Sequence, residues 1–371
     1  MLITLLIAFL SLIILMIIHE FGHFIIAKKF GVRVEEFGIG YPPRIFGKRF
    51  GETIYSVNLI PLGAFVKIYG EESDVDDYRS FSGLAIWKRI LIVLGGVIAF
   101  WVAAIIIFSV LFGIGAKVPV GDNDVPGAGD IQVQVMVVQV GSPAEVAGIQ
   151  AGDFITSVKS AAAGVAVKKI ADFQNFVQEN KGSSVNITVD RQGTEFNFNV
   201  VPRVLHEQDQ GAVGVSLERL ATIIKQYPFY EAPVRGTMFT WEVTVKSLEG
   251  IFGFFANIFA GKGVPAGAEL AGPIGITIFL ANAASYGLGF FLYFIGSISV
   301  LVAIFNLFPI PALDGGKLVF LIIEKIMKKP VPVRWEQTIT AVFFFILIAM
   351  SLFVTVRFDI PRLVDFVKAS I

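Results

Sequence analysis

Long hydrophobic runs alternate with shorter polar stretches along this chain. Residues 1–27 contain a single charged residue, Glu20, and a helix of that length extends about 40 Å, enough to cross a bilayer. Three further hydrophobic runs lie at 90–115, 286–316 and 338–356. The pattern therefore predicts a polytopic α-helical membrane protein with four transmembrane helices.

The basic residues predict how these four helices are oriented. Residues 28–89 hold ten Lys and Arg, and a second basic group within 317–337 follows the third hydrophobic run. Because Lys and Arg accumulate on the cytoplasmic side of membrane proteins, we expect both regions to be cytoplasmic. The N-terminus, residues 116–225 and the tail at 357–371 are then expected to lie outside.

The segment 226–285 is the ambiguous part of the pattern. Within 236–260, the charged residues Glu242, Lys246 and Glu249 recur at helical spacing on one face, opposite an aromatic face. We expect an amphipathic helix that lies on the membrane surface and is followed by a linker. A fifth transmembrane helix is the alternative interpretation.

The cytoplasmic region contains a β-rich stretch at 52–70. Two runs rich in β-branched and aromatic residues meet at Pro61-Leu62-Gly63, which predicts a β-hairpin with little polar surface. Two interpretations remain open: a ribbon in an ordinary loop, or a hairpin that re-enters the bilayer beside the polar residues of the first helix. The second requires that protein or water satisfies the hairpin backbone.

Residues 116–225 have a mixed composition that predicts a soluble, β-rich α+β domain inserted between the second and third spans. The stretch 141–155 resembles the Ser-Pro-Ala and Gly-Asp signature of PDZ domains, and this resemblance covers roughly residues 130–220. It implies that a late glycine-containing loop holds the C-terminal carboxylate of a peptide ligand. The candidate residues of this loop are Gly211, Val213, Gly214 and Val215.

Composition narrows the chemistry that the chain can perform. The net formal charge is zero, so there is no overall positive field of the kind that attracts nucleic acid. The absence of cysteine excludes disulfides and thiolate metal ligands. The chain has three histidines, His19, His23 and His206, and we expect the last to be a solvated surface residue outside the membrane.

The first hydrophobic run contains the sequence His-Glu-Phe-Gly-His. His19 and His23 are four residues apart, so on a helix both imidazoles project from one face and can reach one zinc ion. Glu20 lies beside them, within reach of a metal-bound water. Ionisable residues inside a membrane span are costly and usually functional. The alternative is that both histidines are buried and satisfied by other groups.

A carboxylate is needed to complete such a metal site, and Asp314 is the best candidate. Pro309 and Pro311 disrupt the end of the third hydrophobic run and free backbone carbonyls at membrane depth. Asp314 follows this break, and the basic residues after it place it on the cytoplasmic side. His23 is expected at a matching depth on the same side.

Four motifs occur in order along the chain: the His-Glu-Phe-Gly-His run, the PDZ-like signature, Gly272-Pro-Ile-Gly275 and the segment from Asn306 to Leu313-Asp-Gly-Gly316. Together they resemble the bacterial site-2 proteases, the RseP-like and RasP-like intramembrane zinc metalloproteases, over essentially the whole chain. The chain departs from that family in having one PDZ-like domain and in having Gly63-Ala64 where Gly-Gly is common.

The resemblance implies specific roles for residues of this chain. His19, His23 and Asp314 would bind Zn2+, and Glu20 would be the catalytic base. The hairpin would be a membrane re-entrant substrate clamp. The implied substrate-binding residues are Asn306, Pro311, Asn58 and Gly63.

The expected function is hydrolysis of peptide bonds within transmembrane segments of single-span membrane proteins. Anti-sigma factors or signal-peptide remnants, after a prior cleavage of the ectodomain, are the expected substrates. The expected location is the bacterial cytoplasmic (inner) membrane, with lipid as a partner, no nucleic acid, the PDZ-like domain outside and the active site near the cytoplasmic face. The oligomeric state is left open.

Two alternative functions belong to other classes. A non-catalytic membrane scaffold with a PDZ-like domain would need none of His19, Glu20, His23 and Asp314. A transporter with a helix broken near Asn306 would show an internal repeat, and the sequence shows none.

Overall fold

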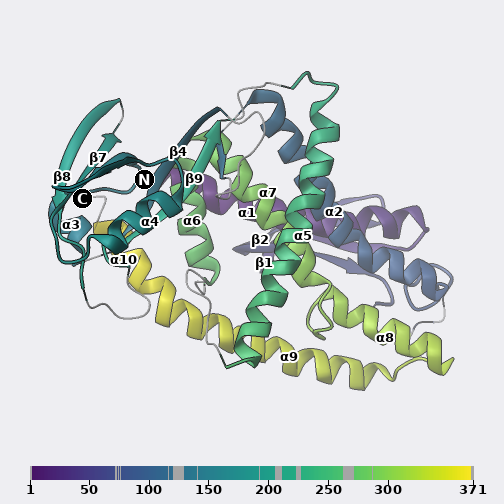
Figure 1. Ribbon diagram of the computed structural model, residues 1–371. Helices are drawn as coiled ribbons and strands as arrows, with labels where there is room; N and C mark the ends of the chain where they lie inside the picture. Colours follow the sequence, from purple (N-terminus) through teal and green to yellow (C-terminus); the bar gives the residue numbers. More distant parts are fainter. Residues whose placement is uncertain are drawn as a thin grey trace.

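The computed structural model describes residues 2–71, 73, 75, 77–115, 117–119, 129–139, 141–191, 193–204, 211–222, 227–261, 271–285 and 287–368. Within these residues, four helical segments are long and apolar enough to cross a membrane, at the places that the hydrophobic runs predict. They comprise α1 (Leu2–Lys29), α2 (Ile86–Ile114), α7 (Leu288–Asn306) and α9 (Val333–Val354) (Figure 1).

The third span ends earlier than the sequence predicts. Helix α7 stops at Asn306, and a new helix, α8 (Asp314–Met327), begins at Asp314. Pro309 and Pro311 lie in the intervening turn, where their missing N–H groups interrupt the helical hydrogen-bond ladder. Much of the expected loop 317–337 is therefore helical.

The C-terminal tail also differs from the expectation. Helix α9 continues through a π-helical turn, Thr355–Asp359, into α10 (Ile360–Lys368). Helix α9 contains no buried residue, but contacts fix it near its two ends. Thr340 Oγ1 donates to Pro311 O over 3.2 Å, and the Gly272 N–H donates to the buried Asp359 carboxylate over 3.0 Å. Gly272 directly precedes α6 (Pro273–Ser285), a short apolar helix.

Helices α1 and α2 pack with their backbones in close contact. A Cβ atom added to Gly22 would lie 2.2 Å from Gly95 O, and one added to Gly95 would lie 2.6 Å from Gly22 O. Small residues allow such close approach between membrane helices, where dispersion contacts and not the hydrophobic effect hold the helices together. This crossing brings the polar residues of α1 against the middle of α2.

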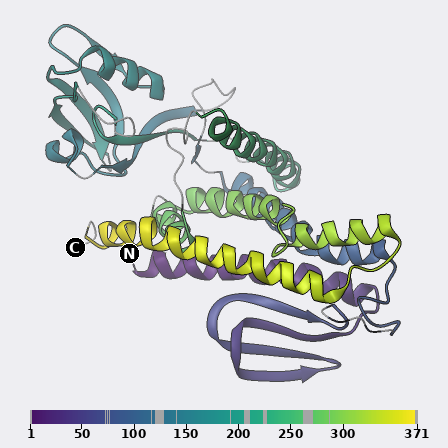
Figure 2. The ribbon, with the colours of Figure 1, turned by 90° about the horizontal axis from the view of Figure 1, so that it is seen from below.

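Helix α5 (Ala232–Phe259) is the predicted amphipathic helix, and it is not among the four candidate spans. It packs on the C-terminal half of α2 through small residues: a Cβ on Gly236 would lie 2.6 Å from Ser109 N. Its large residues Trp241 and Phe252 are exposed. Figure 2 shows α5 on one face of the helical bundle and the β1–β2 sheet on the opposite face.

The β-rich region differs in its pairing from the predicted hairpin. Strand β1 (Val34–Phe50) pairs antiparallel with β2 (Thr53–Ile68), and the tight turn between them lies at residues 51–52. The two runs that the sequence predicted to pair with each other instead both pair with the first part of β1: Phe37 pairs with Val66 and also with Tyr55. A strand has two hydrogen-bonding edges, so this part of β1 lies between the two halves of β2.

Residues 117–222 contribute the β-rich domain. Its seven-stranded sheet has the order β3-β9-β4-β5-β7-β8, with β6 paired to β5, and helix α3 (Pro143–Ala147) and helix α4 (Ile170–Glu179) accompany it. The strands are β3 (Lys117–Pro119), β4 (Gly129–Val138), β5 (Phe154–Lys159), β6 (Gly164–Ala166), β7 (Val185–Arg191), β8 (Thr194–Val200) and β9 (Val215–Thr222).

The PDZ-like signature residues have structural roles in this domain. Ser142 caps α3 by accepting the Glu145 N–H over 3.2 Å. Asp153 is fully buried, and Arg191 donates to both of its carboxylate oxygens over 2.7 and 2.8 Å. The domain lies beyond one end of the bundle, where Leu220 packs with Phe290 of α7.

Candidate metal centre

The three sequence-predicted ligands meet between α1, α2 and α8. His19 Nε2 lies 3.4 Å from Asp314 Oδ2, and His23 Nε2 lies 3.5 Å from the same oxygen. The two Nε2 atoms are 3.2 Å apart. All three ligand atoms therefore lie within 4.8 Å of one another, the only such cluster of His, Asp and Glu side chains in the described part of the chain.

Contacts with α2 set the orientation of both imidazoles. His23 Nδ1 lies 2.9 Å from Ile92 O, and because a carbonyl only accepts, Nδ1 carries the proton and leaves the Nε2 lone pair toward the cluster. The His19 ring stacks on Phe100, with centroids 4.7 Å apart. The two imidazoles meet nearly edge to face, at 87°.

Gly96 makes room for the two histidines. A Cβ atom at this position would lie 2.3 Å from His19 Cε1 and 2.4 Å from His23 Nε2. Real Cβ atoms are essentially never found so close to other atoms, so any side chain here would displace the imidazoles. The two histidines can therefore occupy these positions only because residue 96 is glycine.

The third ligand is held by the turn that precedes α8. Leu313 is the extended N-cap of this helix, and Asp314 is the acidic residue of its first turn. The chain from Leu307 to Pro311 packs closely on the two glycines that follow Asp314. A Cβ at Gly315 would lie 2.2 Å from Phe308 O, and a Cβ at Gly316 would lie 2.3 Å from Ile310 O.

The donor set fits a zinc ion. Two neutral imidazole nitrogens and one carboxylate oxygen form a common catalytic zinc set, which leaves a further position for water or substrate. Asp314 Oδ2 is buried and has no hydrogen-bond partner, so it is a buried acceptor that a cation would satisfy. Within this trio, His23 Nδ1 is already engaged with a backbone carbonyl, as is usual for a metal-bound histidine.

Glu20 lies next to the cluster on α1 and is half-buried. It interacts electrostatically with His23 and Asp314, and its carboxylate interacts with the backbone of Val66 in β2. It is not part of the three-residue cluster. This arrangement agrees with the prediction of a carboxylate beside the metal, with β2 along its other side.

The predicted hairpin residues occupy different environments. Gly63 lies against α1, since a Cβ there would be 2.8 Å from Met16 Cε, one helical turn before His19. Gly63 also has a φ of +81°, a conformation that favours glycine. The Asn58 side chain is buried and donates to Gly40 O over 3.1 Å, so in this structure it braces β1.

The other end of the β1–β2 sheet is fixed to α1 by charge. Glu52, in the turn, accepts hydrogen bonds from Lys28 at the end of α1 and from Arg79. The bonds from Lys28 and Arg79 hold the pKa of Glu52 below its ordinary value. The sheet is thereby attached to α1 both at Lys28 and, through Gly63, at Met16.

The predicted substrate residues Asn306 and Pro311 lie at the start of, and within, the turn before Asp314. Asn306 ends α7 and donates to Val302 O of its own helix over 3.1 Å. Pro311 O accepts the Thr340 hydroxyl of α9. Contact of either residue with a substrate stays a prediction.

The predicted peptide-binding loop lies outside the bundle, directly before β9. Val213 is buried in the domain core, and its carbonyl accepts the Ala144 N–H over 3.1 Å. Gly214 has a φ of +79°, and its carbonyl accepts the Gln139 N–H over 2.9 Å. The first bond ties the loop to α3, and the second ties it to the residue that follows β4. Gly211 and Val215 lie on either side of these two residues. The predicted surface residue His206 lies outside the described residues.

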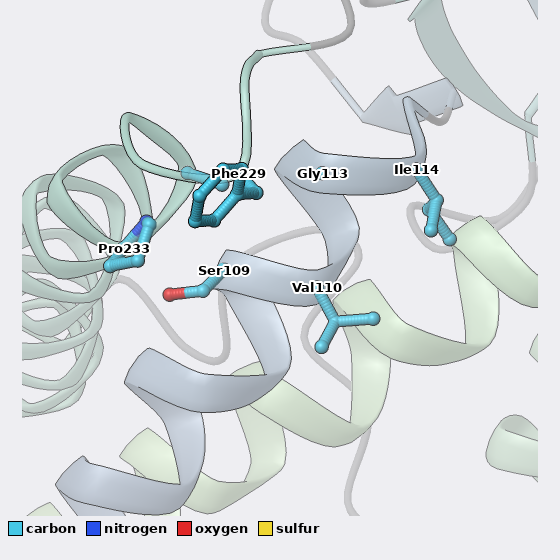
Figure 3. A pocket seen from close by; sticks show the side chains of 7 residues that line it. Ser109, Val110, Gly113, Ile114, Phe229 and Pro233 are labelled. Atoms are coloured by element: carbon cyan, nitrogen blue, oxygen red, sulfur yellow. The ribbon is translucent and has the colours of Figure 1, made fainter.

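A separate groove lies near the C-terminal end of α2 (Figure 3). It is about 20 Å along that helix from Gly96 by the helical rise and contains no titratable or metal-binding side chain. Its volume is about 340 Å³, and its lining residues are Ser109, Val110, Gly113, Ile114, Phe229, Ala232 and Pro233. Among the described residues, the metal-ligand cluster and this groove are therefore separate features.

Sequence reasoning missed Gly96, Ile92 and Met16, which shape the cluster and its surroundings. Gly96 stands within an apolar run beside Gly95, and nothing in the run separates the two glycines by role. Met16 lies on the same face of α1 as His19 and His23, at a spacing of three and seven residues, and that periodicity was the available signal.

Comparison with known proteins identifies the family. The chain matches the model of Peptidase family M50 over residues 7–350. Similar proteins each carry the name "Putative zinc metalloprotease". One from Clostridium perfringens is 31% identical over 345 residues, covering 92% of this chain and 94% of that protein. One from Nostoc sp. is 28% identical over 351 residues, covering 93% of each, and one from Rickettsia conorii is 32% identical over 330 residues, covering 85% and 87%. Because the matched region contains all three clustered residues, the chain belongs to peptidase family M50, and the resemblance to site-2 proteases is confirmed.

Proposed function

We propose that this protein is an intramembrane zinc metalloprotease that hydrolyses peptide bonds within the transmembrane segments of single-span membrane proteins. The observation that carries the proposal is the convergence of His19, His23 and Asp314 between apolar helices, with Glu20 beside them. Family membership supplies the class of reaction, and the names of the similar proteins support zinc as the metal.

Each polar residue has a defined task in this proposal. His19, His23 and Asp314 hold the zinc ion, and Ile92 O keeps the His23 tautomer that presents Nε2. When bound, zinc polarises a peptide carbonyl and lowers the pKa of its water to about 7. Glu20 takes the proton of the attacking water and afterwards delivers it to the leaving amine. Phe100 and the apolar helices exclude bulk water from this exchange.

The β1–β2 sheet is proposed to hold the substrate in an extended form. A peptide bond in a transmembrane helix is shielded by its own hydrogen bonds, so the helix must unwind before hydrolysis. The last part of β2 pairs with β1 along one edge, and among the described residues no strand pairs with its other edge. That edge lies near Glu20, through Val66, so a substrate added there as a strand would reach the catalytic carboxylate.

The charge distribution supports the proposed location of the protein in the membrane. Lys and Arg gather in 28–89 and near the end of α8, which supports a cytoplasmic-side active site and an extracytoplasmic β-rich domain in the bacterial inner membrane. Substrates of the anti-sigma factor kind, or signal-peptide remnants, would enter after another protease has removed their ectodomains.

The β-rich domain is proposed to act as a PDZ-like size filter. The motif at 141–155 and the loop at 211–215 support this assignment, as does the position of the domain at the end of the bundle away from α8. A bulky folded ectodomain would be stopped there, whereas a trimmed one would pass. Peptide binding at the loop before β9 belongs to the same proposal.

Cleavage by the purified full-length chain tests the proposed reaction. In detergent, the chain should cleave a model single-span protein within its transmembrane segment, and a zinc chelator should stop the reaction. The Glu20→Gln variant should bind zinc but not cleave, because the amide keeps the volume and cannot take the proton. A scaffold would show no zinc-dependent cleavage, and turnover by Glu20→Gln would remove Glu20 from the role of base.

A further inference from the structure

One face of α8 carries more than the metal ligand. Asp314, Lys317, Leu321 and Glu324 follow one another at spacings of three, four and three residues, so they lie along a single face of the helix. Leu321 is buried against Phe81, Ile92 and neighbouring apolar residues. The remaining two charged residues of this face each form an ion pair with another element.

The first ion pair lies one turn beyond Asp314. Lys317 Nζ donates to Glu71 Oε1, and the same ammonium lies 5.3 Å from the centroid of the Phe81 ring. Both partners are mostly shielded, with side-chain exposures of 25% for Lys317 and 21% for Glu71. A shielded pair of this kind is screened less by salt than an exposed one, and loss of one partner leaves the other charge unpaired.

The second ion pair holds the far part of the same face. Arg89 Nη1 of α2 donates to Glu324 Oε1 over 2.8 Å, and its guanidinium lies 5.1 Å from the Phe81 ring. Phe81, which is 2% exposed, therefore contacts cations from both α2 and α8. This pair lies about 15 Å from Asp314 along the helix by the helical rise.

Glu71 follows a backbone segment that is held by hydrogen bonds. The Phe81 N–H donates to Tyr69 O over 2.8 Å, and the Ser82 N–H donates to Gly70 O over 3.2 Å. The buried Ser80 hydroxyl donates to carbonyls of the same loop, including Val75 O over 2.8 Å. These bonds fix the segment just after β2 to the segment just before α2.

The Lys317–Glu71 pair connects the two sides of the metal centre. Asp314 lies within electrostatic range of Lys317, and Glu20 lies within electrostatic range of Glu71. Because the charges of Lys317 and Glu71 cancel, the pair can join α8 to the end of β2 without adding net charge beside the metal. The link runs from α8, which carries Asp314, to the end of β2, which lies along α1.

We propose that Lys317 and Glu71 are positioning residues that keep Asp314 at the distance from His19 and His23 that zinc requires. The inference rests on the proposed zinc function. Ligand geometry for zinc tolerates errors of only about 0.2 Å, so a small shift of the first turn of α8 would weaken binding. Loss of groups that orient metal ligands typically lowers metal affinity about 10- to 100-fold.

The test measures zinc release from full-length protein in detergent, with a chromophoric chelator as acceptor. The Glu71→Gln and Lys317→Met variants should each release zinc about 10-fold or more faster than the wild type. The double variant should be no faster than the faster single variant, because the two side chains act as one pair. Lys317→Arg, which can still pair with Glu71, should restore slow release.

Lys67→Met is the matched control, because Lys67 pairs with Glu35 on the exposed part of the β1–β2 sheet at 3.1 Å. It should release zinc at the wild-type rate. The inference would be overturned if both Glu71→Gln and Lys317→Met released zinc within twofold of the wild-type rate. It would also be overturned if Lys317→Arg released zinc as fast as Lys317→Met. A wild-type protein that binds no zinc would instead refute the proposed function itself.

Discussion

Gly96 offers the sharpest test of how the metal centre is built. In the Gly96→Ala variant, the new methyl carbon would lie 2.4 Å from His23 Nε2 and 2.5 Å from His19 Nδ1. Ordinary contact begins near 3.4 Å, so at least one imidazole has to retreat by about 1 Å. Zinc coordination tolerates about 0.2 Å, so the shift is several times too large.

The Gly96→Ala substitution should change the folding stability of the protein much less than it changes the zinc affinity. Alanine is favoured over glycine in a helix by about 1 kcal/mol, which offsets part of the overpacking cost of about 1–3 kcal/mol. We therefore expect Gly96→Ala to fold with a thermal midpoint close to that of the metal-free wild type. Its zinc affinity should fall by at least about 10- to 100-fold.

The assay is zinc content after equilibration with buffers of graded free zinc, together with thermal unfolding of the metal-free protein. Gly113→Ala is the control in the same helix, because its added Cβ would meet only Ala232 Cβ, at 3.9 Å. That variant should keep wild-type zinc affinity. Wild-type affinity in Gly96→Ala would refute the reasoning, since it would show that the imidazoles do not need the space above Gly96.

The remaining predictions concern the third ligand, the topology and the β-rich domain. Asp314→Asn should lose zinc at low free metal, since a neutral amide is a poorer ligand; a full zinc complement would place the third ligand elsewhere. Single cysteines at Ser73 and Ser184 of this cysteine-free chain should label from opposite sides of the membrane; labelling from one side contradicts the four-span topology. Deletion of 130–220 should leave cleavage of a short-ectodomain substrate intact and permit cleavage of a long-ectodomain one; loss of both, with zinc retained, would mean that the domain delivers substrate.

Much of the architecture could be predicted because it depends on local chemistry. A hydrophobic run longer than a bilayer's ~30 Å core has few alternatives to a helix, so α1, α2, α7 and α9 follow from composition. The four-residue spacing of His19 and His23 places both on one face of any helix. Neither inference needs knowledge of what lies across the bundle.

Strand pairing in the β1–β2 region was harder to predict. The sequence shows where β-branched and aromatic residues gather, but their pairing partners depend on which edges are free in three dimensions. Phe37 takes both Val66 and Tyr55 as partners, so the two runs around Pro61 do not pair with each other. The prediction of one local hairpin turn at Pro61-Leu62-Gly63 was wrong because the pairing is made with an earlier segment.

The amino-acid sequence alone predicted four long apolar helices and singled out His19, Glu20, His23 and Asp314 as candidates, and the resemblance to site-2 proteases gave their implied roles. The helices depend on composition, and the pairing of His19 with His23 depends on a spacing within one helix. The tertiary structure decided that Gly96 lies over both imidazoles, that Ile92 O orients His23, and that Lys317 of α8 pairs with Glu71. Each of these contacts joins residues from different elements, and their proximity is a property of helix crossings and loop conformation that no periodicity along the chain encodes.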